Sequence, residues 1–392
     1  MRLGLALGCL LIMSSSHAAF DPPPEEANEF HFVVLGDAQF DRPQLFNRIV
    51  DQTRRLRPSF VIQVGDLIDG YKNDLSEIRA EWDRFGRQIS PLDPVRFIAV
   101  PGNHDVYNRN RAVDARLEQI FTDRWGPLYF SFRYKNAEFI VLNSDSTEQS
   151  NGIAGRQLEW LRETLKQPAP RHRFVFLHRP PLLMKNARPL HELFKGGGVS
   201  HVFYGHHHHY HFLERDGIAY IMTNASGNSV NTLAETGGMP HLLQVSVRGE
   251  EVNVAPIMAD AIFAHDAVDP QDNYDFYALN RKLAPRAVKL EKSGTNRYKL
   301  KIPLQNTSER AIQVYAECSS ADQRWIFTPQ ALSPQQLSSG KRGSIAMEVS
   351  FTADRVPESE PECALRIPFQ TRHGRWIDFT RKVKAEAAQF SR

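Results

Sequence analysis

Polar side chains of the metal-binding type follow five apolar segments of the chain, each at the point where the segment ends. The segments at 30–35, 60–64 and 95–100 are followed by GDAQ, GDLID and PGNHD, and those at 174–177 and 201–204 by a histidine and by GHHHH. Carboxylates, amides and imidazoles are ligands that divalent transition metals take in proteins. A single GD pair is more often a turn with a capping aspartate. Five such motifs in order are hard to obtain from turn chemistry alone, and together they predict a site.

The apolar segments have the composition of strands that are covered on both faces, since they are rich in Val, Ile and Phe and hardly alternate. Segments with helical spacing separate them, and the one at 41–58 places Leu45 and Ile49 on one face with Pro43 in its first turn. Residues 241–257 alternate about a Gly-Glu turn and predict an antiparallel hairpin. This pattern predicts an α/β architecture with a mixed sheet. Because ligands bind outside the carboxyl ends of the strands in such sheets, the five motifs are expected to meet there.

The pattern changes after about residue 285. Short strand-like segments are separated by turn residues, without a helical period. They predict a small all-β domain over 285–392, an immunoglobulin-like β-sandwich. Residues 258–284 are polar and partly helical in pattern, and we interpret them as a linker. No cluster of ionisable residues in 285–392 has the composition of a site.

The order of the polar motifs resembles that of the calcineurin-like metallophosphoesterases. The resemblance covers about residues 30–257, and GRQLEWLRETL at 155–165 is similar to a helix common in that family. It implies a layered α/β/β/α sandwich of two mixed sheets with a dinuclear metal centre. Most of the family has histidine at the position of Gln39, so the chain resembles the subgroup with glutamine there.

The resemblance also implies a role for each residue of the motifs. The residues that would hold the two metal ions are Asp37, Gln39, Asp66 and His208 for the first ion, and Asp66, Asn103, His178 and His206 for the second. Asp66 would bridge the two ions. His104 would be the catalytic histidine, oriented by Asp69, and Asn103 would also steady the phosphoryl oxygens.

The chemistry of these residue types agrees with a two-metal site. Such a site needs a bridging carboxylate, terminal nitrogen and oxygen ligands, and open positions for water and phosphate. Mixed ligands of this kind suit manganese, iron, zinc or cobalt better than calcium. The amide oxygen of Gln39 is a weaker donor than imidazole and favours manganese. The implied reaction is attack of a metal-bridging hydroxide on phosphorus, with protonated His104 neutralising the leaving oxygen. Arg42, Arg109 and Arg179 lie near the motifs in sequence and could clamp phosphate, but a solvated surface arginine is the simpler interpretation of each.

The four consecutive histidines of GHHHH raise a question of register. In an extended segment, side chains two residues apart project to the same side. His206 and His208 can then face the metal ions together, whereas His207 and His209 cannot. Gly205 is expected to let the chain turn tightly at the strand end, which makes His206 the first residue able to reach the site. The alternative pair, His207 and His209, would require a slip of one residue.

The start of the chain has the pattern of an export signal. An arginine precedes an apolar stretch that ends at Met13, and small residues follow. This predicts a signal peptide over 1–18, cleaved near Ala18, and a periplasmic or secreted protein; the stretch is too short to span a membrane. Its removal leaves Cys318 and Cys363. An even pair favours one disulfide in an oxidising compartment, and two buried free thiols are the alternative.

The chain has 392 residues and a formal net charge of +3. This mildly basic balance suits an anionic substrate and is far from a nucleic-acid-binding patch. The sequence therefore predicts an exported hydrolase of phosphomonoesters, acting on a phosphorylated small molecule or on a lipid or protein phosphoester. The alternatives are a phosphodiesterase or pyrophosphatase acting on nucleotides or phospholipid headgroups, and a non-catalytic metal-binding surface module. No transmembrane segment is expected, and the oligomeric state is left open.

Overall fold

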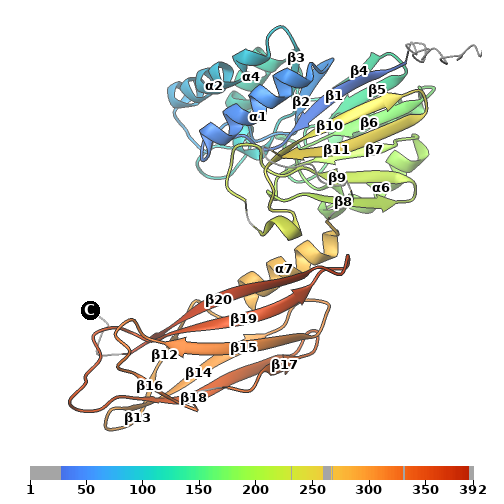
Figure 1. Ribbon diagram of the computed structural model, residues 1–392. Helices are drawn as coiled ribbons and strands as arrows, with labels where there is room; N and C mark the ends of the chain where they lie inside the picture. Colours follow the sequence, from blue (N-terminus) through green and yellow to red (C-terminus); the bar gives the residue numbers. More distant parts are fainter. Residues whose placement is uncertain (1–27, 231, 259–265, 267, 330–331, 388–392) are drawn as a thin grey trace, which may run out of the picture.

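The computed structural model describes residues 28–230, 232–258, 266, 268–329 and 332–387. The predicted signal peptide, residues 1–18, lies outside the described residues. Figure 1 shows an N-terminal and a C-terminal part with helix α7 (Pro270–Lys282) between them. Within the described residues, no helix combines the length and the apolar character needed to cross a membrane.

The N-terminal part contains two mixed sheets. The strands of the first are β1 (Phe30–Leu35), β2 (Phe60–Gln63), β3 (Arg96–Ala99), β10 (His241–Arg248) and β11 (Glu251–Met258), in the order β11-β10-β1-β2-β3. The strands of the second are β4 (Phe130–Tyr134), β5 (Ala137–Val141), β6 (His172–Phe176), β7 (His201–Tyr204), β8 (His211–Arg215) and β9 (Ile218–Met222), in the order β4-β5-β6-β7-β9-β8. Strands β1, β2 and β3 of the first sheet and β5, β6, β7 and β9 of the second run parallel, and the other pairs are antiparallel, including the predicted β10–β11 hairpin.

Phenylalanine rings fill the space between the two sheets. Phe32 of β1 packs edge-on against Phe139 of β5 and Phe174 of β6, with ring centroids 5.3 and 5.6 Å apart. The next residues along the strands, Val33 and Ile140, point to the opposite faces and are also fully buried. Both faces of the strands are therefore covered, which explains why their sequences hardly alternate.

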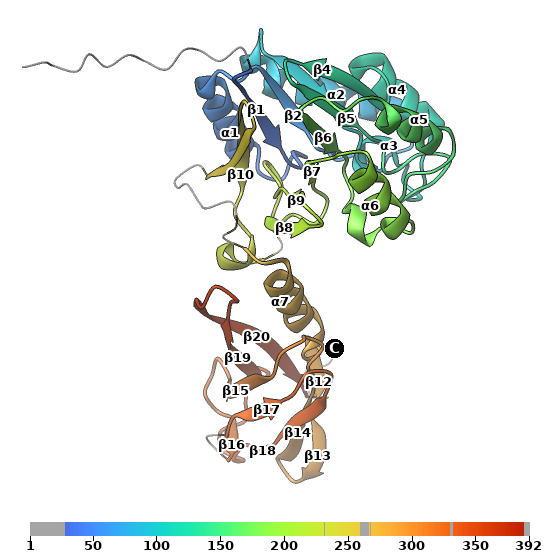
Figure 2. The ribbon, with the colours of Figure 1, turned by 90° about the vertical axis from the view of Figure 1, so that its right-hand side faces the viewer.

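Helices cover the outer faces of both sheets. Those on the first sheet are α1 (Pro43–Leu56), α2 (Leu75–Ile89) and α4 (Ala115–Trp125), and those on the second are α5 (Gly155–Lys166) and α6 (Ala187–Gly196) (Figure 2). Helix α1 has Pro43 in its first turn and buries Leu45 and Ile49 against the sheet, as predicted. The predicted layered α/β fold with two mixed sheets is confirmed.

The described residues of the C-terminal part form two further sheets. The strands of the first are β12 (Ala287–Lys289), β15 (Ile312–Ser319), β17 (Gln335–Leu337), β19 (Glu362–Gln370) and β20 (Trp376–Glu386). The strands of the second are β13 (Glu291–Gly294), β14 (Arg297–Gln305), β16 (Ile326–Thr328) and β18 (Arg342–Ser350). Side chains from both sheets, such as Ile302 and Leu365, share one core. A disulfide between Cys318 and Cys363 joins β15 to β19, as predicted. The immunoglobulin-like topology stays a prediction.

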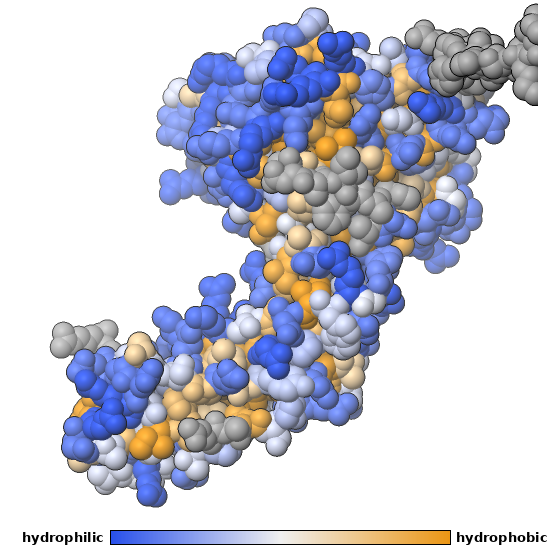
Figure 3. Space-filling view, viewed as in Figure 1, coloured by the Kyte–Doolittle hydropathy of each residue, from blue (hydrophilic) through white to orange (hydrophobic). Residues whose placement is uncertain are grey.

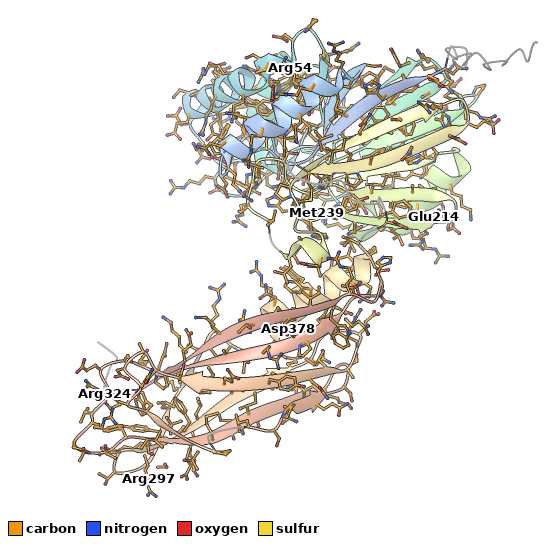
Figure 4. All side chains as sticks on the ribbon, in the orientation of Figure 1. Arg54, Glu214, Met239, Arg297, Arg324 and Asp378 are labelled. Carbon is orange, nitrogen blue, oxygen red and sulfur yellow. A yellow bond between two sulfur atoms is a disulfide. The ribbon has the colours of Figure 1, made fainter. Side chains whose placement is uncertain are left out.

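Helix α7 lies inside the segment that the sequence suggested as a linker, 258–284. Its side chains Phe276 and Leu279 are buried in the core of the C-terminal part. Figure 4 labels Met239 and Glu214, which lie on the side of the N-terminal part that faces this helix. The C-terminal half of the predicted linker is therefore a packed helix.

Candidate active site

The five predicted motifs meet at the carboxyl ends of strands from both sheets. Asp37, Asp66 and Asn103 follow β1, β2 and β3 of the first sheet, whereas His178 and His206 follow β6 and β7 of the second. The first four of these side chains are buried, and His206 is partly buried. Parallel strands deliver their carboxyl ends to one edge of a sheet, and the packing of two sheets brings the two edges together.

One group of four side chains surrounds a single point. The Nε2 atom of His178 lies 3.1 Å from Asn103 Oδ1, 3.1 Å from Asp66 Oδ2 and 3.1 Å from His206 Nδ1. The other ring nitrogen of His178, Nδ1, lies 2.9 Å from the carbonyl oxygen of Val64. A carbonyl only accepts, so Nδ1 carries a proton. Nε2 faces the carboxylate and amide oxygens, and a cation between them, either a proton on Nε2 or a metal ion in its place, offsets the repulsion between these acceptors.

The spacing of these atoms fits a metal ion. Two ligands that lie about 2.1 Å from one ion at right angles are about 3 Å apart. The candidate donor atoms of Asp66, His178 and His206 all lie within 4.8 Å of one another. Burial lowers the pKa of the His178 imidazole, but the charge and hydrogen bond of Asp66 outweigh this effect and raise it to about 9. The carboxylate thus attracts positive charge to this point, which is the requirement for binding a cation.

A second group of donors lies beside the first. Asp37 Oδ2 is 3.0 Å from His208 Nε2, while His208 Nδ1 is 3.0 Å from the carbonyl oxygen of Ser229 and so carries the proton. The buried Gln39 Oε1 has no hydrogen-bond partner among the described residues. A buried acceptor without a donor costs free energy unless another group satisfies it. Asp37, Gln39 and His208 are thus a second set of possible donor side chains.

Four of the predicted ligands have left-handed backbone conformations. The φ angles are 41° at Gln39, 52° at Asp66, 78° at His206 and 54° at His208. Such angles are uncommon for residues other than glycine and cost of order 1–3 kcal/mol each, and they concentrate at functional sites. The surrounding fold holds these side chains in directions that an unstrained strand end would not give them.

The catalytic histidine proposed from the sequence, His104, lies beside the shared carboxylate. Its backbone N–H donates to Asp66 Oδ1 at 2.9 Å, and its ring Nδ1 is 2.5 Å from the backbone carbonyl of Asp69. His104 therefore contacts Asp69 as expected, but through the backbone carbonyl of Asp69 and not through its carboxylate. The Asp69 carboxylate instead accepts from the backbone N–H of Phe40 at 3.2 Å, which joins the first two motif loops. Because Nδ1 donates to a carbonyl, Nε2 is the ring atom left to exchange a proton with a substrate.

Tyr71 belongs to the site and was missed in the sequence. Its hydroxyl oxygen accepts from Asn103 Nδ2 at 2.8 Å, and its ring packs edge-on against His104 with centroids 4.4 Å apart. With Nδ2 held in this way, Oδ1 of Asn103 is fixed toward His178. The sequence signal is a tyrosine just after GDLIDG, which is not distinctive in a turn.

The arginines near the motifs separate into two kinds. Arg42 and Arg109 are exposed, as the simple interpretation predicts. Arg179 is not: its Nε lies 2.6 Å from a carboxylate oxygen of the fully buried Asp145, and its Nη1 lies 2.9 Å from His206 Nε2. The surface interpretation of Arg179 is therefore wrong, because this side chain contacts a candidate metal ligand.

The histidine turn, residues 205–209, places the expected pair in the site for a different reason from the one proposed. The segment is not an extended strand, since His206 and His208 both have positive φ angles. Gly205 has no such angle, but a Cβ atom there would lie 2.6 Å from Asp37 Oδ1. Glycine is needed for the close approach of the chain to the Asp37 carboxylate.

The remaining histidines of this region are not at the surface. His207 is partly buried, and His209 and His211 are buried. His211 Nε2 lies 3.1 Å from the Tyr204 hydroxyl, so its predicted surface position is wrong. His209 Nδ1 lies 3.1 Å from the carbonyl oxygen of His207 and donates to it.

Within residues 30–210 the fold and the donor side chains have the features of a metallophosphoesterase domain. The sequence model of the calcineurin-like phosphoesterase family matches residues 30–210, and this part of the chain belongs to that family. The match ends at the histidine turn. The chain is thus a hydrolase that acts on phosphate esters, and its C-terminal part lies outside the matched region.

Known proteins resemble the same part of the chain. A human serine/threonine-protein phosphatase, CPPED1, is 28% identical over 236 residues, which cover 54% of this chain and 72% of that protein. A probable cyclic nucleotide phosphodiesterase from Rhodococcus erythropolis is 26% identical over 194 residues, covering 46% of this chain and 62% of the relative. The structure of a purple acid phosphatase from yellow lupin aligns with a TM-score of 0.50 at 14% identity, over 61% of this chain and 53% of the lupin protein. The structural likeness concerns the fold alone.

Proposed function

We propose that the protein is an exported, dinuclear-metal phosphoesterase that hydrolyses phosphomonoesters. The observation that carries this proposal is the convergence of buried lone pairs in two adjacent groups, around His178 Nε2 and beside Asp37, with Asp66 in the first group. The first group would hold one ion through Asp66, Asn103, His178 and His206. The second would hold the other ion through Asp37, Gln39 and His208, with Asp66 as the bridge.

Divalent ions bound there would activate the attacking water and neutralise charge on the phosphoryl oxygens. Manganese is favoured because Gln39 contributes an amide oxygen in place of an imidazole, and oxygen ligands suit manganese. The orphaned Gln39 Oε1 supports this choice of ligand.

The side chains themselves would position the substrate and move a proton. His104 Nε2 is 3.9 Å from Asp66 Oδ2, so it lies at the edge of the donor groups, where a leaving oxygen can reach it. Its Nδ1 is held by the Asp69 carbonyl, which fixes the ring orientation. Asn103, held by Tyr71, would steady a phosphoryl oxygen as well as a metal ion.

Export is supported by two independent features. The first is the pattern of residues 1–18, and the second is the Cys318–Cys363 disulfide, because disulfides persist in oxidising compartments. We further propose that the C-terminal part is an immunoglobulin-like accessory domain, on the basis of its two sheets with a shared core.

Phosphodiester hydrolysis is the second candidate activity, and it is favoured by the similarity to the probable cyclic nucleotide phosphodiesterase from Rhodococcus erythropolis. A chromogenic aryl phosphomonoester and the matching bis-aryl diester, each assayed with added manganese, separate the two activities. The proposal predicts a higher kcat/KM for the monoester. A higher kcat/KM for the diester would overturn the monoester assignment, and turnover of neither would favour a non-catalytic metal-binding module.

A further inference from the structure

A cavity of about 260 Å³ lies directly beside the candidate active site. One wall is the histidine turn, with His206, His207 and His209. The opposite wall is helix α7, with Tyr274, Tyr277 and Arg281. His206 belongs to both places, since its Nδ1 atom faces the donor group around His178. A group attached to a phosphate at the site could therefore extend into this cavity.

The wall that α7 provides is held in place on the N-terminal side. Val268, two residues before the start of α7, is buried in the core between the two sheets of the N-terminal part. Asn273 Nδ2 donates to the carbonyl oxygen of Thr236 at 2.8 Å. The ring of Tyr274 packs edge-on against that of His211, with centroids 6.1 Å apart. In Figure 3, hydrophobic residues reach the surface at this narrow junction of the two parts.

The same wall is held on the C-terminal side by buried charges. Arg310 pairs with Asp272 at 2.6 Å and with Asp275 at 2.9 Å, and both carboxylates are only 2% exposed. The guanidinium of Arg310 also lies over the ring of Phe369, 4.4 Å from its centroid. The C-terminal part thus fixes the orientation of α7 and, through it, the shape of the cavity. The C-terminal part, which lies outside the family match, therefore contacts the helix that lines the cavity.

The chemistry of the cavity favours a flat group with hydrogen-bonding edges. Tyr277 is 48% exposed, an unusually open position for a large ring, and the guanidinium of Arg281 lies 5.4 Å from its centroid. Aromatic and guanidinium faces together stack well on planar rings. His209 Nε2 is buried without a partner among the described residues, and because Nδ1 carries the proton, Nε2 accepts. A ligand with an N–H or O–H group could satisfy it.

The volume limits the size of the ligand. Cavities that bury a drug-sized molecule measure about 300–1,000 Å³, so this one has room for a single small ring system. We propose that the cavity binds the base of a nucleoside monophosphate, whose phosphate is hydrolysed at the adjacent site. This inference rests on the proposed function and specifies its substrate class.

The test compares two substrates with the same ester bond on the full, manganese-loaded protein. Adenosine 5′-monophosphate carries a base and ribose 5-phosphate does not. We expect kcat/KM to be at least about tenfold higher for the nucleotide, mostly through KM, since stacking of a base is worth about that factor or more. In Tyr277→Ala and in Arg281→Ala this ratio should fall toward one. Equal kcat/KM values in the wild type, or an unchanged ratio in both variants, would overturn the proposal.

Tyr315→Ala is the matched control, because Tyr315 also lies under an arginine, Arg366, at 4.7 Å, but on the C-terminal sheet. It should leave the ratio unchanged. If neither substrate is hydrolysed, the proposed function fails. Calorimetric binding of adenosine 5′-monophosphate then tests the proposed ligand of the cavity independently of hydrolysis. Binding that weakens about tenfold in Tyr277→Ala but not in Tyr315→Ala supports the cavity. Binding that is absent, or equal in all three proteins, rejects it.

Discussion

The side-chain amide of Asn103 donates to the hydroxyl oxygen of Tyr71 across 2.8 Å, and this contact leaves Asn103 Oδ1 3.1 Å from His178 Nε2. An amide can rotate by half a turn with little steric change, which would present its NH₂ group instead of its oxygen. In the structure Tyr71 holds the Asn103 amide with its oxygen toward the proposed metal ion.

Tyr71→Phe should weaken metal binding and lower kcat, because it removes the partner that fixes the Asn103 amide. Loss of such an outer contact typically costs 10- to 100-fold in metal affinity or activity. Activity titrated against manganese concentration measures both effects, and Tyr129→Phe, at a partly exposed ring far from the motifs in sequence, is the control. A variant with wild-type metal affinity and wild-type kcat would show that Tyr71 only fills space.

His104→Ala should slow the hydrolysis of an alkyl phosphate far more than that of an aryl phosphate with an acidic phenol. The proton from His104 matters in proportion to how poor the leaving group is, and general acid catalysis typically contributes about 10²–10⁴-fold. The kcat of His104→Ala on both esters, relative to wild type, measures this difference. An equal loss on both would mean that His104 positions phosphate and donates no proton.

Stability should fall in mild acid because of buried neutral histidines, and His241 is the simplest case. Burial lowers the pKa of its imidazole to about 4, whereas the unfolded value is 6.5. Between these values the unfolded chain binds the proton and the folded chain does not, so the stabilisation present above pH 6.5 is lost as the pH drops toward 4. The free energy of unfolding falls by on the order of 3 kcal/mol, at about 1.4 kcal/mol for each unit of difference between the folded and unfolded pKa.

Urea unfolding of the His241→Asn variant at pH 7 and pH 4.5 checks this expectation. The variant should lose less stability than wild type between the two pH values. His373→Asn, at an exposed turn position, should behave as wild type. A pH dependence that is the same in all three proteins would contradict the assignment to His241.

The Cys318–Cys363 disulfide should leave no free thiol in an unreduced, unfolded chain that lacks residues 1–19. The bridge spans 45 residues and on the loop-entropy model is worth about 4 kcal/mol. Cys318→Ser should therefore melt the C-terminal part early while the N-terminal part stays folded. Two thiols in Ellman titration of the wild type would refute the bridge.

The strand-end motifs could be predicted from the sequence because strand, turn and ligand are neighbours in the chain. His206 and His208 contact His178 and Asp37 in the structure, but the extended geometry from which this pair was predicted is excluded by their positive φ angles. Strain of this kind depends on the surrounding fold and leaves no local pattern. Their roles as metal ligands stay predictions.

Contacts between distant segments could not be predicted. Arg179 and Asp145 are 34 residues apart and meet only after the second sheet forms. The packing of α7 against both parts of the chain depends on Asn273 and on charges buried against Arg310. A single sequence gives the polarity of such residues but not their partners, which explains why 258–284 was interpreted as a linker.

The number of metal ions bound by the protein tests the central claim most directly. Elemental analysis after loading with manganese and removal of free ions should find two ions per wild-type chain, one in His178→Ala and one in His208→Ala. His207→Ala should keep two, because His207 belongs to neither donor group. Fewer than two ions in the wild type, or a loss in His207→Ala equal to that in His208→Ala, would contradict a dinuclear site built from these residues.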